Sequence, residues 1–259
     1  MDVALKLNQA ELGAQVLSAQ APGLGELFFV SDIALSSRRL PRGGVPVLFP
    51  QFADRGSLIK HGFARYSMWQ SSSVDTCCRT IKRLDVAPDD FKDWPYKASI
   101  VLETYLSEGA FEQSLTVINT GDEAFSWCGG LHPYILVNDL EKSSLSGLAG
   151  VPYKDRYSEV AGLIGENSLE WDGAPCEKLF RAAPPLILSS GCKRLKISTT
   201  GFDQWMVWNP GKDGASKLPD MDDGDWRHFV CIEPVCVDKQ VTLPACSDFS
   251  GSLKFEWNI

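Results

Sequence analysis

The stretch Ala98–Asn119, ASIVLETYLSEGAFEQSLTVIN, says more about the fold than any other part of the chain. Apolar and polar residues alternate on both sides of a short turn, as they do in strands that bury one face. The residues that share a face are Ile100, Leu102, Thr104 and Leu106 in the first run, and Leu115 and Val117 in the second. The intervening SEG at 107–109 has turn composition, so the stretch predicts an antiparallel hairpin.

The rest of the chain repeats this pattern in shorter pieces separated by Gly and Pro. Further strands are expected at Glu26–Ile33, Leu186–Leu188, Leu195–Ser198, Trp205–Trp208, Phe229–Ile232 and Ser252–Trp257. Helical periodicity is weak, and no helices of 10–15 residues alternate with strands, which argues against a parallel α/β sheet. The sequence predicts an all-β protein, a large antiparallel β-sandwich with few short helices. No linker or repeat divides residues 1–259, so we expect one domain.

Composition excludes several classes of protein. The chain has 259 residues, 44% of them hydrophobic and 22% charged, with a net charge of −8, which disfavours nucleic-acid binding. No uncharged apolar run is long enough to cross a membrane, and residues 1–20 lack the apolar core of a secretory signal. The eight cysteines include no CxxC pair, so we expect reduced thiols, several of them buried, in a cytoplasmic protein. A monomer is the simplest expectation for the assembly.

Four short stretches could bear chemistry: LPRGGVPVLFPQ at Leu40–Gln51, KHGFAR at Lys60–Arg65, GGLHPY at Gly129–Tyr134 and VCIEP at Val230–Pro234. Paired glycines at 43–44 suit positive φ or a close backbone approach; the alternative is an ordinary turn into a Pro-bearing edge segment. The acidic loop Asp220–Asp225 is interpreted as a solvated turn.

Glu233 is the most informative single position. It ends an apolar run immediately before Pro234, so we expect it at a strand end and partly desolvated, which would raise its pKa into the range of a general base. The alternative is a carboxylate that points into water. Of the three histidines, His61 and His132 lie in Gly-containing loops and His228 is expected to face solvent. For His61 and His132, the alternative is that each is a structural histidine that forms hydrogen bonds and takes no part in catalysis.

The basic residues are unevenly distributed. Between Arg38 and Arg65 there are six basic residues against one acidic residue, Asp54, a net charge of +5 in a chain of net −8. Because the Arg fork can bond two phosphate oxygens, this segment is a candidate anion site. A solvated basic edge is the alternative.

At these positions the sequence resembles the glucose-6-phosphate 1-epimerases, or hexose-6-phosphate mutarotases, of the aldose 1-epimerase superfamily. The matching motifs, in family order, are RGGVPVLFPQF at Arg42–Phe52, HGFARYSMW at His61–Trp69, LHPYILVNDLEKSSLSGL at Leu131–Leu148, VWNP at Val207–Pro210 and FVCIEPVCV at Phe229–Val237. The resemblance implies a galactose-mutarotase-type β-sandwich. It also implies an isomerase without a cofactor or metal, whose substrate is a hexose 6-phosphate.

The resemblance also implies roles for particular residues. The catalytic residues are His132 as acid and Glu233 as base, so His132 would be protonated and Glu233 ionised when substrate binds, and a bell-shaped pH profile would follow. Substrate-binding residues are Arg42 and Arg65 for the phosphate, His61, and Glu177 within CEKLF at the place of a family Asp in a DRxY-type motif. Lys60 stands where some relatives have Gln.

Three other functions remain open at this point. Mutarotation of unphosphorylated aldoses would use the same acid–base pair without an arginine clamp. A non-catalytic carbohydrate-binding sandwich would use Trp residues as platforms and tolerate loss of Glu233. A metal-binding β-barrel would use His61, His132 and Glu233 as ligands, although the paired-His spacing usual for such barrels is absent.

Overall fold

Antiparallel ladders make up most of the computed structural model, which describes residues 4–33, 41–72, 76, 78–157, 161–165 and 168–257. A three-stranded sheet contains β1 (Lys6–Gln9), β2 (Val16–Ala21) and β3 (Gly25–Glu26). An eight-stranded sheet contains β4 (Val47–Leu48), β9 (Phe125–Leu131), β10 (Tyr134–Leu136), β12 (Pro152–Asp155), β13 (Ala161–Leu163), β15 (Cys176–Phe180), β18 (Gln204–Asn209) and β19 (Phe229–Leu243). A nine-stranded sheet contains β5 (Gln70–Ser71), β6 (Arg79–Val86), β7 (Ala98–Leu106), β8 (Ala110–Asn119), β11 (Ser143–Ser146), β14 (Leu169–Glu170), β16 (Leu186–Ser190), β17 (Lys193–Thr200) and β20 (Asp248–Glu256).

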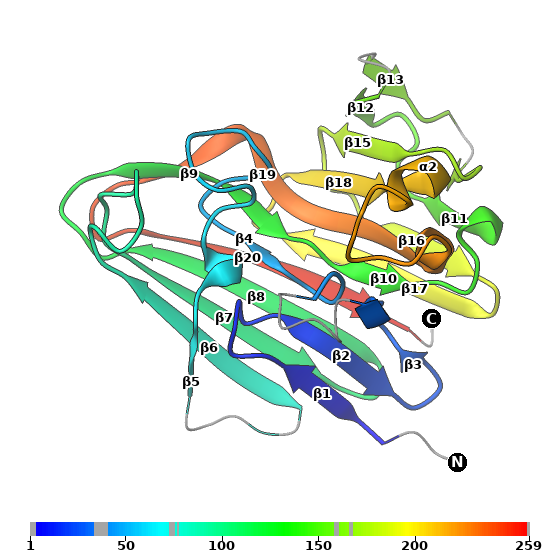
Figure 1. Ribbon diagram of the computed structural model, residues 1–259, viewed down its shortest axis with the longest axis horizontal. Helices are drawn as coiled ribbons and strands as arrows, with labels where there is room; N and C mark the ends of the chain where they lie inside the picture. The colour runs from blue at the N-terminus through cyan, green and yellow to red at the C-terminus, as the bar shows by residue number, and fades with distance from the viewer. Residues whose placement is uncertain are drawn as a thin grey trace.

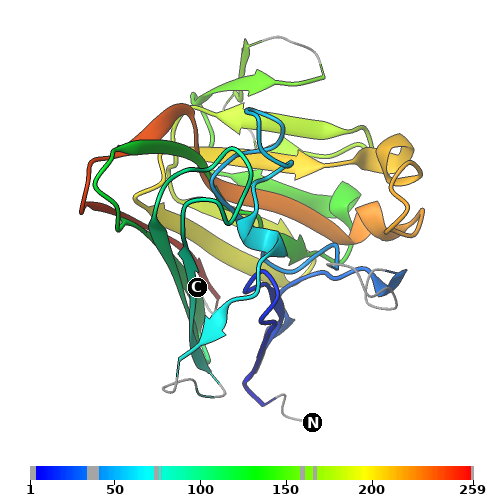
Figure 2. The ribbon, with the colours of Figure 1, turned by 60° about the vertical axis from the view of Figure 1, so that its left-hand side comes forward.

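The two large sheets form the sandwich that the sequence predicts. Their strand orders are β13-β12-β15-β18-β19-β9-β4, with β10 added beside β19, and β14-β11-β16-β17-β20-β8-β7-β6-β5. In Figure 1, β5 to β8 lie at the lower left and β12, β13 and β15 at the upper right, so the layers are offset; Figure 2 turns the same ribbon by 60°. The short helices are η1 (Ala64–Tyr66), η2 (Leu140–Lys142), α2 (Gly211–Ala215) and η3 (Asp225–His228).

Aromatic side chains from both sheets fill the space between the layers. Trp127 of β9 and Trp205 of β18 are fully buried, as are Phe111 of β8 and Phe255 of β20, and all four belong to one continuous core cluster. The Trp127 ring lies 5.2 Å from that of Phe249 on β20, which joins the two sheets directly. Burial of one such side chain stabilises a fold by about 1.5–3 kcal/mol relative to leaving it exposed.

The hairpin expected at 98–119 is confirmed as β7 and β8. Their register pairs Ala98 with Asn119 and Leu106 with Phe111. The backbone N–H of Ser107 donates to the carbonyl of Ala110 at 2.8 Å and closes the turn. The alternating face predicted from sequence is buried on both strands. The strands expected within β16, β17, β18 and β20 are also present.

The strand expected at Glu26–Ile33 is wrong. Only Gly25 and Glu26 form β3, and Phe28 and Val30 make single bridges. The Glu26 carboxylate accepts the backbone N–H groups of Ala19, Leu27 and Phe28 at 2.9–3.0 Å. The segment beyond Glu26 still pairs through its backbone, but with different neighbours in turn: the N–H of Leu27 donates to Ala19 and that of Phe29 to Tyr134, so no regular ladder forms.

The expected end of a strand at Glu233 is also wrong, because β19 continues through Pro234 to Leu243. On one side of the strand, β10 pairs with β19 up to Cys231 and β9 begins to pair at Val235. Pro234 lies opposite the break between these two partners, so its missing N–H removes no ladder bond there. Glu233 is therefore in the interior of the sheet, where backbone on both sides keeps out water.

The remaining expectations concern cysteines and membranes. Cys128, Cys176, Cys231 and Cys236 are buried free thiols and Cys192 and Cys246 are exposed ones, whereas Cys77 lies outside the described residues. None of the helices in the described part of the chain combines the length and the apolar character that a membrane span requires.

Candidate active site

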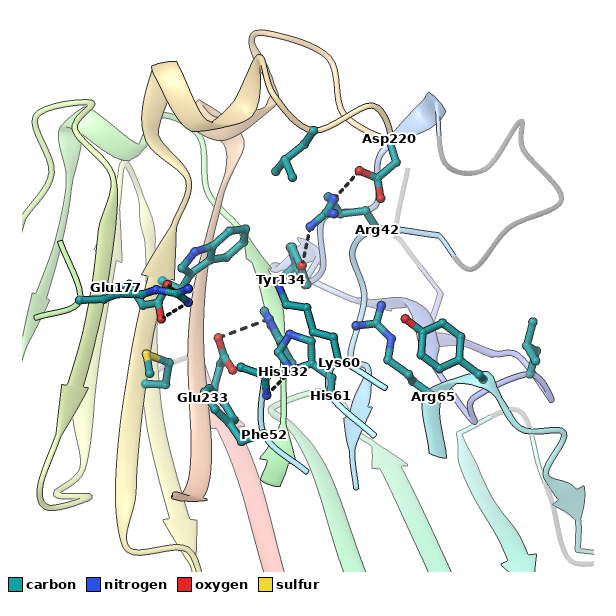
Figure 3. Close-up of a pocket in the computed structure, with 17 residues that line it drawn as sticks. Arg42, Phe52, Lys60, His61, Arg65, His132, Tyr134, Glu177, Asp220 and Glu233 are labelled. Carbon is teal, nitrogen blue, oxygen red and sulfur yellow. Dashed lines mark hydrogen bonds and ion pairs between the residues drawn. The ribbon is translucent and has the colours of Figure 1, made fainter. Parts of the chain in front are cut away.

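One cavity of about 590 Å³ brings together all six side chains to which the sequence assigned a role: His132, Glu233, His61, Arg42, Arg65 and Glu177. Figure 3 shows them facing one another around this cavity. They come from segments as far apart in sequence as Arg42 and Glu233, and from both the β4–β9 edge and the β15–β18–β19 region of the eight-stranded sheet. The volume lies within the range of roughly 300–1,000 Å³ that small-molecule sites have.

His132 and Glu233 form the innermost pair of the cavity. His132 follows β9, and its backbone N–H donates to the carbonyl of Pro46 at 3.0 Å, which fixes the loop beside β4. Glu233 lies on β19 opposite Met206 of β18. His132 Nε2 is 3.5 Å from Glu233 Oε1, the closest approach of the two side chains (Figure 3). Glu233 is only 1% exposed, so the interpretation that it points into water is excluded.

Burial controls the charge of this pair. It raises the pKa of Glu233 well above the usual carboxyl range, with a further contribution from the negative charge of Glu177. Burial also lowers the pKa of His132 well below its usual value, and the cationic forms of His61, Arg65 and Arg42 add to the effect. Both directions favour the uncharged form of each group, that is, the state in which the pair holds one titratable proton, on the Glu233 carboxyl.

His61 is held in one orientation and one tautomer. Its backbone has φ +67°, and its Nδ1 accepts the backbone N–H of Ala53 at 3.2 Å. The neutral ring must therefore keep its proton on Nε2. Burial, with repulsion from Arg65 and Lys60, lowers the pKa of His61 to about 3. His61 is thus a neutral hydrogen-bond donor, and its ring lies 5.7 Å from that of His132.

The paired glycines place Arg42 at the rim of the cavity. Gly43 and Gly44 have φ +126° and +60°, and a Cβ on either would collide with a backbone carbonyl oxygen, of Phe29 or of Val16. Arg42 Nε donates to Asp220 Oδ1 at 2.9 Å, and its Nη1 donates to the Tyr134 hydroxyl at 3.3 Å. Burial alone would lower the pKa of Arg42, but Tyr134 and Asp220 more than offset this, and the pKa rises.

Arg65 and Lys60 supply positive charge with no counter-ion among the described residues. Arg65 is in η1, its guanidinium lies 5.3 Å from the ring of Tyr66, and its buried Nε has no hydrogen-bond partner there. Lys60 extends into the cavity below Tyr134 in Figure 3. Arg42, Lys60 and Arg65 of the basic segment therefore form a basic side of the cavity. Arg55 pairs with Asp238 instead and does not line it, and Arg38 and Arg39 lie outside the described residues.

Glu177 lies on the opposite side of the cavity. It is on β15 next to Trp208 of β18, and Arg156 Nη1 contacts its carboxylate at 3.1 and 3.4 Å. The sequence also contains the triplet Asp155-Arg156-Tyr157, for which no role was predicted. Arg156 of this triplet lines the cavity, whereas Asp155 pairs with Lys178 and does not line it.

Two features differ from the sequence-based interpretation of the site. Asp220 is not merely part of a solvated turn, because it bonds Arg42 and lines the cavity. The metal alternative named His61 as a ligand, but in the described part of the chain the group of potential ligands is His132, Cys231 and Glu233. Tyr134, whose ring stacks on His132 at 4.8 Å, and Trp208 were missed, although both lie inside motifs that the resemblance used.

Comparison with known proteins identifies the family. A family model described as aldose 1-epimerase matches residues 4–245. The chain belongs to the aldose 1-epimerase family. It is therefore an epimerase, an isomerase that interconverts the anomers of a small sugar.

Curated relatives of this epimerase carry more specific names. A protein of Cenchrus ciliaris named "Putative glucose-6-phosphate 1-epimerase" is 28% identical over 93% of this chain and 78% of its own length. A protein of Escherichia coli K12 with the same name is 25% identical over 88% of this chain and 79% of its own.

Solved structures confirm the fold. A structure described as a putative mutarotase from Salmonella typhimurium superimposes with a TM-score of 0.85 at 20% identity, covering 96% of this chain and 85% of that one. A galactose mutarotase-like protein from Lactobacillus casei gives a TM-score of 0.75 at 16% identity, covering 99% and 98%. The galactose-mutarotase-type sandwich expected from the resemblance is therefore confirmed.

Proposed function

We propose that this epimerase interconverts the α and β anomers of a hexose 6-phosphate, with glucose 6-phosphate as the preferred substrate. The observation that carries the proposal is the 3.5 Å His132–Glu233 pair inside a cavity whose other side holds Arg42, Arg65 and Lys60. The pair suits proton exchange at a sugar ring, and the cations suit a dianion. The names of the curated relatives agree with this substrate.

Anomerisation requires one proton removed and one supplied. Glu233 takes the proton of the C1 hydroxyl, the C1–O1 bond becomes a carbonyl, and the C1–O5 bond breaks as His132 protonates O5. The open aldehyde rotates about C1–C2, and the hydroxyl on C5 then attacks the other face of the carbonyl. His132 regains its proton from that hydroxyl while Glu233 returns its proton to O1. Each group typically contributes about 10²–10⁴-fold.

The single proton of the free pair supplies this chemistry without exchange with solvent. In the free site, burial favours protonated Glu233 and neutral His132. Transfer of that proton across the 3.5 Å contact gives ionised Glu233 and protonated His132, the charge state that the mechanism uses. A bound phosphate dianion offsets the field of Arg42 and Arg65 on His132 and so stabilises this second state.

The phosphate is assigned mainly to Arg65 and Lys60, with Arg42 completing the site. Arg42 already has Asp220 as counter-ion, whereas the other two have none in the described chain. The buried Nε of Arg65 lacks a partner, and an unmade hydrogen bond of a buried charged group is costly. A phosphate oxygen at this position would satisfy it. The neutral donor His61 Nε2–H lies between these cations and His132, where a sugar hydroxyl could accept its proton.

Anomer exchange followed by NMR on glucose 6-phosphate tests the proposal, with glucose and galactose as matched unphosphorylated controls. We expect exchange of the phosphosugar to be accelerated most, and the activity to survive treatment with a chelator. Loss of activity in chelator that a divalent metal restores would contradict a metal-independent mechanism. No acceleration with any of the sugars would contradict catalysis.

Mutarotation of unphosphorylated aldoses remains a second candidate, because Asp220 neutralises part of the cationic side. Faster exchange of glucose than of glucose 6-phosphate would favour it.

A further inference from the structure

A third potential ligand lies beside the proposed catalytic pair and has no part in the proton transfers. Cys231 and Glu233 are two residues apart on β19, so their side chains point to the same face of the sheet. His132 approaches from the loop between β9 and β10. One ligand atom from each of the three residues lies within 4.8 Å of the other two, and all three residues are buried.

The donor types are those that zinc prefers. Zn²⁺ binds imidazole nitrogen and carboxylate oxygen at about 2.0–2.2 Å and thiolate sulfur at about 2.3 Å, which puts ligand atoms roughly 3.4–3.6 Å apart in a tetrahedral site. His132 Nε2 and Glu233 Oε1 are already 3.5 Å apart. The sulfur of Cys231 lies within 4.8 Å of the other two ligand atoms, so each of its distances to them has to shorten by no more than about 1.2 Å to complete this geometry. His132 and Glu233 line the cavity, so an ion can enter and keep its fourth position toward the open space.

The surroundings distinguish this group from a permanent metal centre. A histidine that holds a resident metal almost always donates its second ring N–H to a fixed partner. His132 Nδ1 has no such partner among the described residues, and neither does Glu233 Oε2. The three ligands can therefore bind a soft divalent cation, but nothing holds the imidazole in place for it. This arrangement favours reversible binding.

We propose that Zn²⁺ binds reversibly to His132, Cys231 and Glu233 and thereby inhibits the epimerase. On binding, the Cys231 thiol and the His132–Glu233 pair each release a proton to solvent, and the thiolate, the imidazole and the carboxylate bond the ion. The pair then has neither a free base nor a proton to donate, so ring opening stops. The inhibition rests on the proposed function; the binding does not.

Binding is measured without sugar, on the full chain, by calorimetric titration with Zn²⁺ and by the absorption of bound Co²⁺. Cys231→Ser removes the thiolate. Cys236→Ser is the matched control, because Cys236 is also buried on β19 but points to the other face of the sheet. All proteins carry Cys192→Ser and Cys246→Ser, which remove the exposed thiols.

We expect the reference protein and Cys236→Ser to bind Zn²⁺ with thiolate-to-cobalt absorption in the Co²⁺ form. Cys231→Ser should lose that absorption and bind Zn²⁺ more than about 100-fold more weakly. Removing a residue that only hydrogen-bonds to a ligand weakens metal binding by roughly 10–100-fold, so a larger loss indicates that Cys231 is itself a ligand. Equal Zn²⁺ affinity in both cysteine variants would overturn the proposal.

The inhibition is measured by anomer exchange at buffered free Zn²⁺. We expect Zn²⁺ to inhibit the reference protein, a chelator to reverse this, and Cys231→Ser to resist it. Equal sensitivity of both cysteine variants would overturn the inhibitory role. If no sugar is turned over even in chelator while the cysteine-dependent binding persists, the proposed function fails and the metal site stands.

Discussion

Replacement of Arg65 by Ala should separate the turnover of phosphosugar from that of free sugar. Arg65 lines the cavity without a counter-ion in the described chain, and its buried Nε is unpaired. A hydrogen bond to a charged group contributes about 1.5–3 kcal/mol. At about 1.4 kcal/mol per factor of ten, loss of one such bond lowers kcat/KM for glucose 6-phosphate by roughly 10–150-fold. The loss should appear mainly in KM, because the phosphate is gripped equally in the ground and transition states.

The assay is anomer exchange by NMR with glucose 6-phosphate and glucose for wild type and Arg65→Ala. Free glucose has no phosphate, so its slow turnover should barely change. Arg79→Ala is the control, since it removes the same charge from β6, where Arg79 pairs with Glu103 outside the cavity. If both substrates fall by the same factor, Arg65 is structural or catalytic. If wild type prefers glucose, the phosphosugar assignment fails.

Other substitutions test the pair and the fold. Glu233→Gln and His132→Ala should each lower kcat by at least about 100-fold, with the double variant well short of additive, and near-normal turnover of folded Glu233→Gln would refute the assignment. The profile of kcat/KM against pH should fall in acid through the lowered pKa of His132 and in alkali through the raised pKa of Glu233. Because the charge of Glu177 raises the pKa of Glu233, Glu177→Gln should move the alkaline limb to lower pH; an unmoved limb would contradict this. Leu115→Ala, in the core, should lower the free energy of unfolding in urea by about 2–5 kcal/mol, and half-buried Ile118→Ala by much less; equal losses would contradict the packing.

Local sequence pattern predicts those parts of the fold in which backbone pairs with backbone. The hairpin at 98–119 is correct because alternation and turn composition agree. The strand at Glu26–Ile33 fails because alternation does not reveal that its residues will pair with different neighbours, Leu27 with Ala19 and Phe29 with Tyr134. The strand end at Glu233 fails for a similar reason. The effect of Pro234 depends on the break between β9 and β10, which lies about 100 residues away along the chain.

The site was predictable only through residues within recognisable motifs. His132 and Glu233 lie in such motifs, and the fold places them together. Asp220 was interpreted as solvated because its partner Arg42 is 178 positions away in the sequence. Cys231 lies in an apolar run that contains no motif for metal binding. Its side chain comes close to His132 only because β10 pairs with β19. The electrostatics of the site thus depend on contacts between residues far apart in the sequence, and a local sequence pattern does not reveal such contacts.

The construction of β4 has a consequence for self-association. β4 is the last strand of the eight-stranded sheet, contains only Val47 and Leu48, and is bracketed by Pro46 and Pro50. An exposed sheet edge invites another chain to add a strand, and short edge strands flanked by proline resist this. The carbonyl of Pro46 accepts the backbone N–H of His132 and so holds that loop against β4. The edge that positions the imidazole of His132 is therefore also a poor template for aggregation.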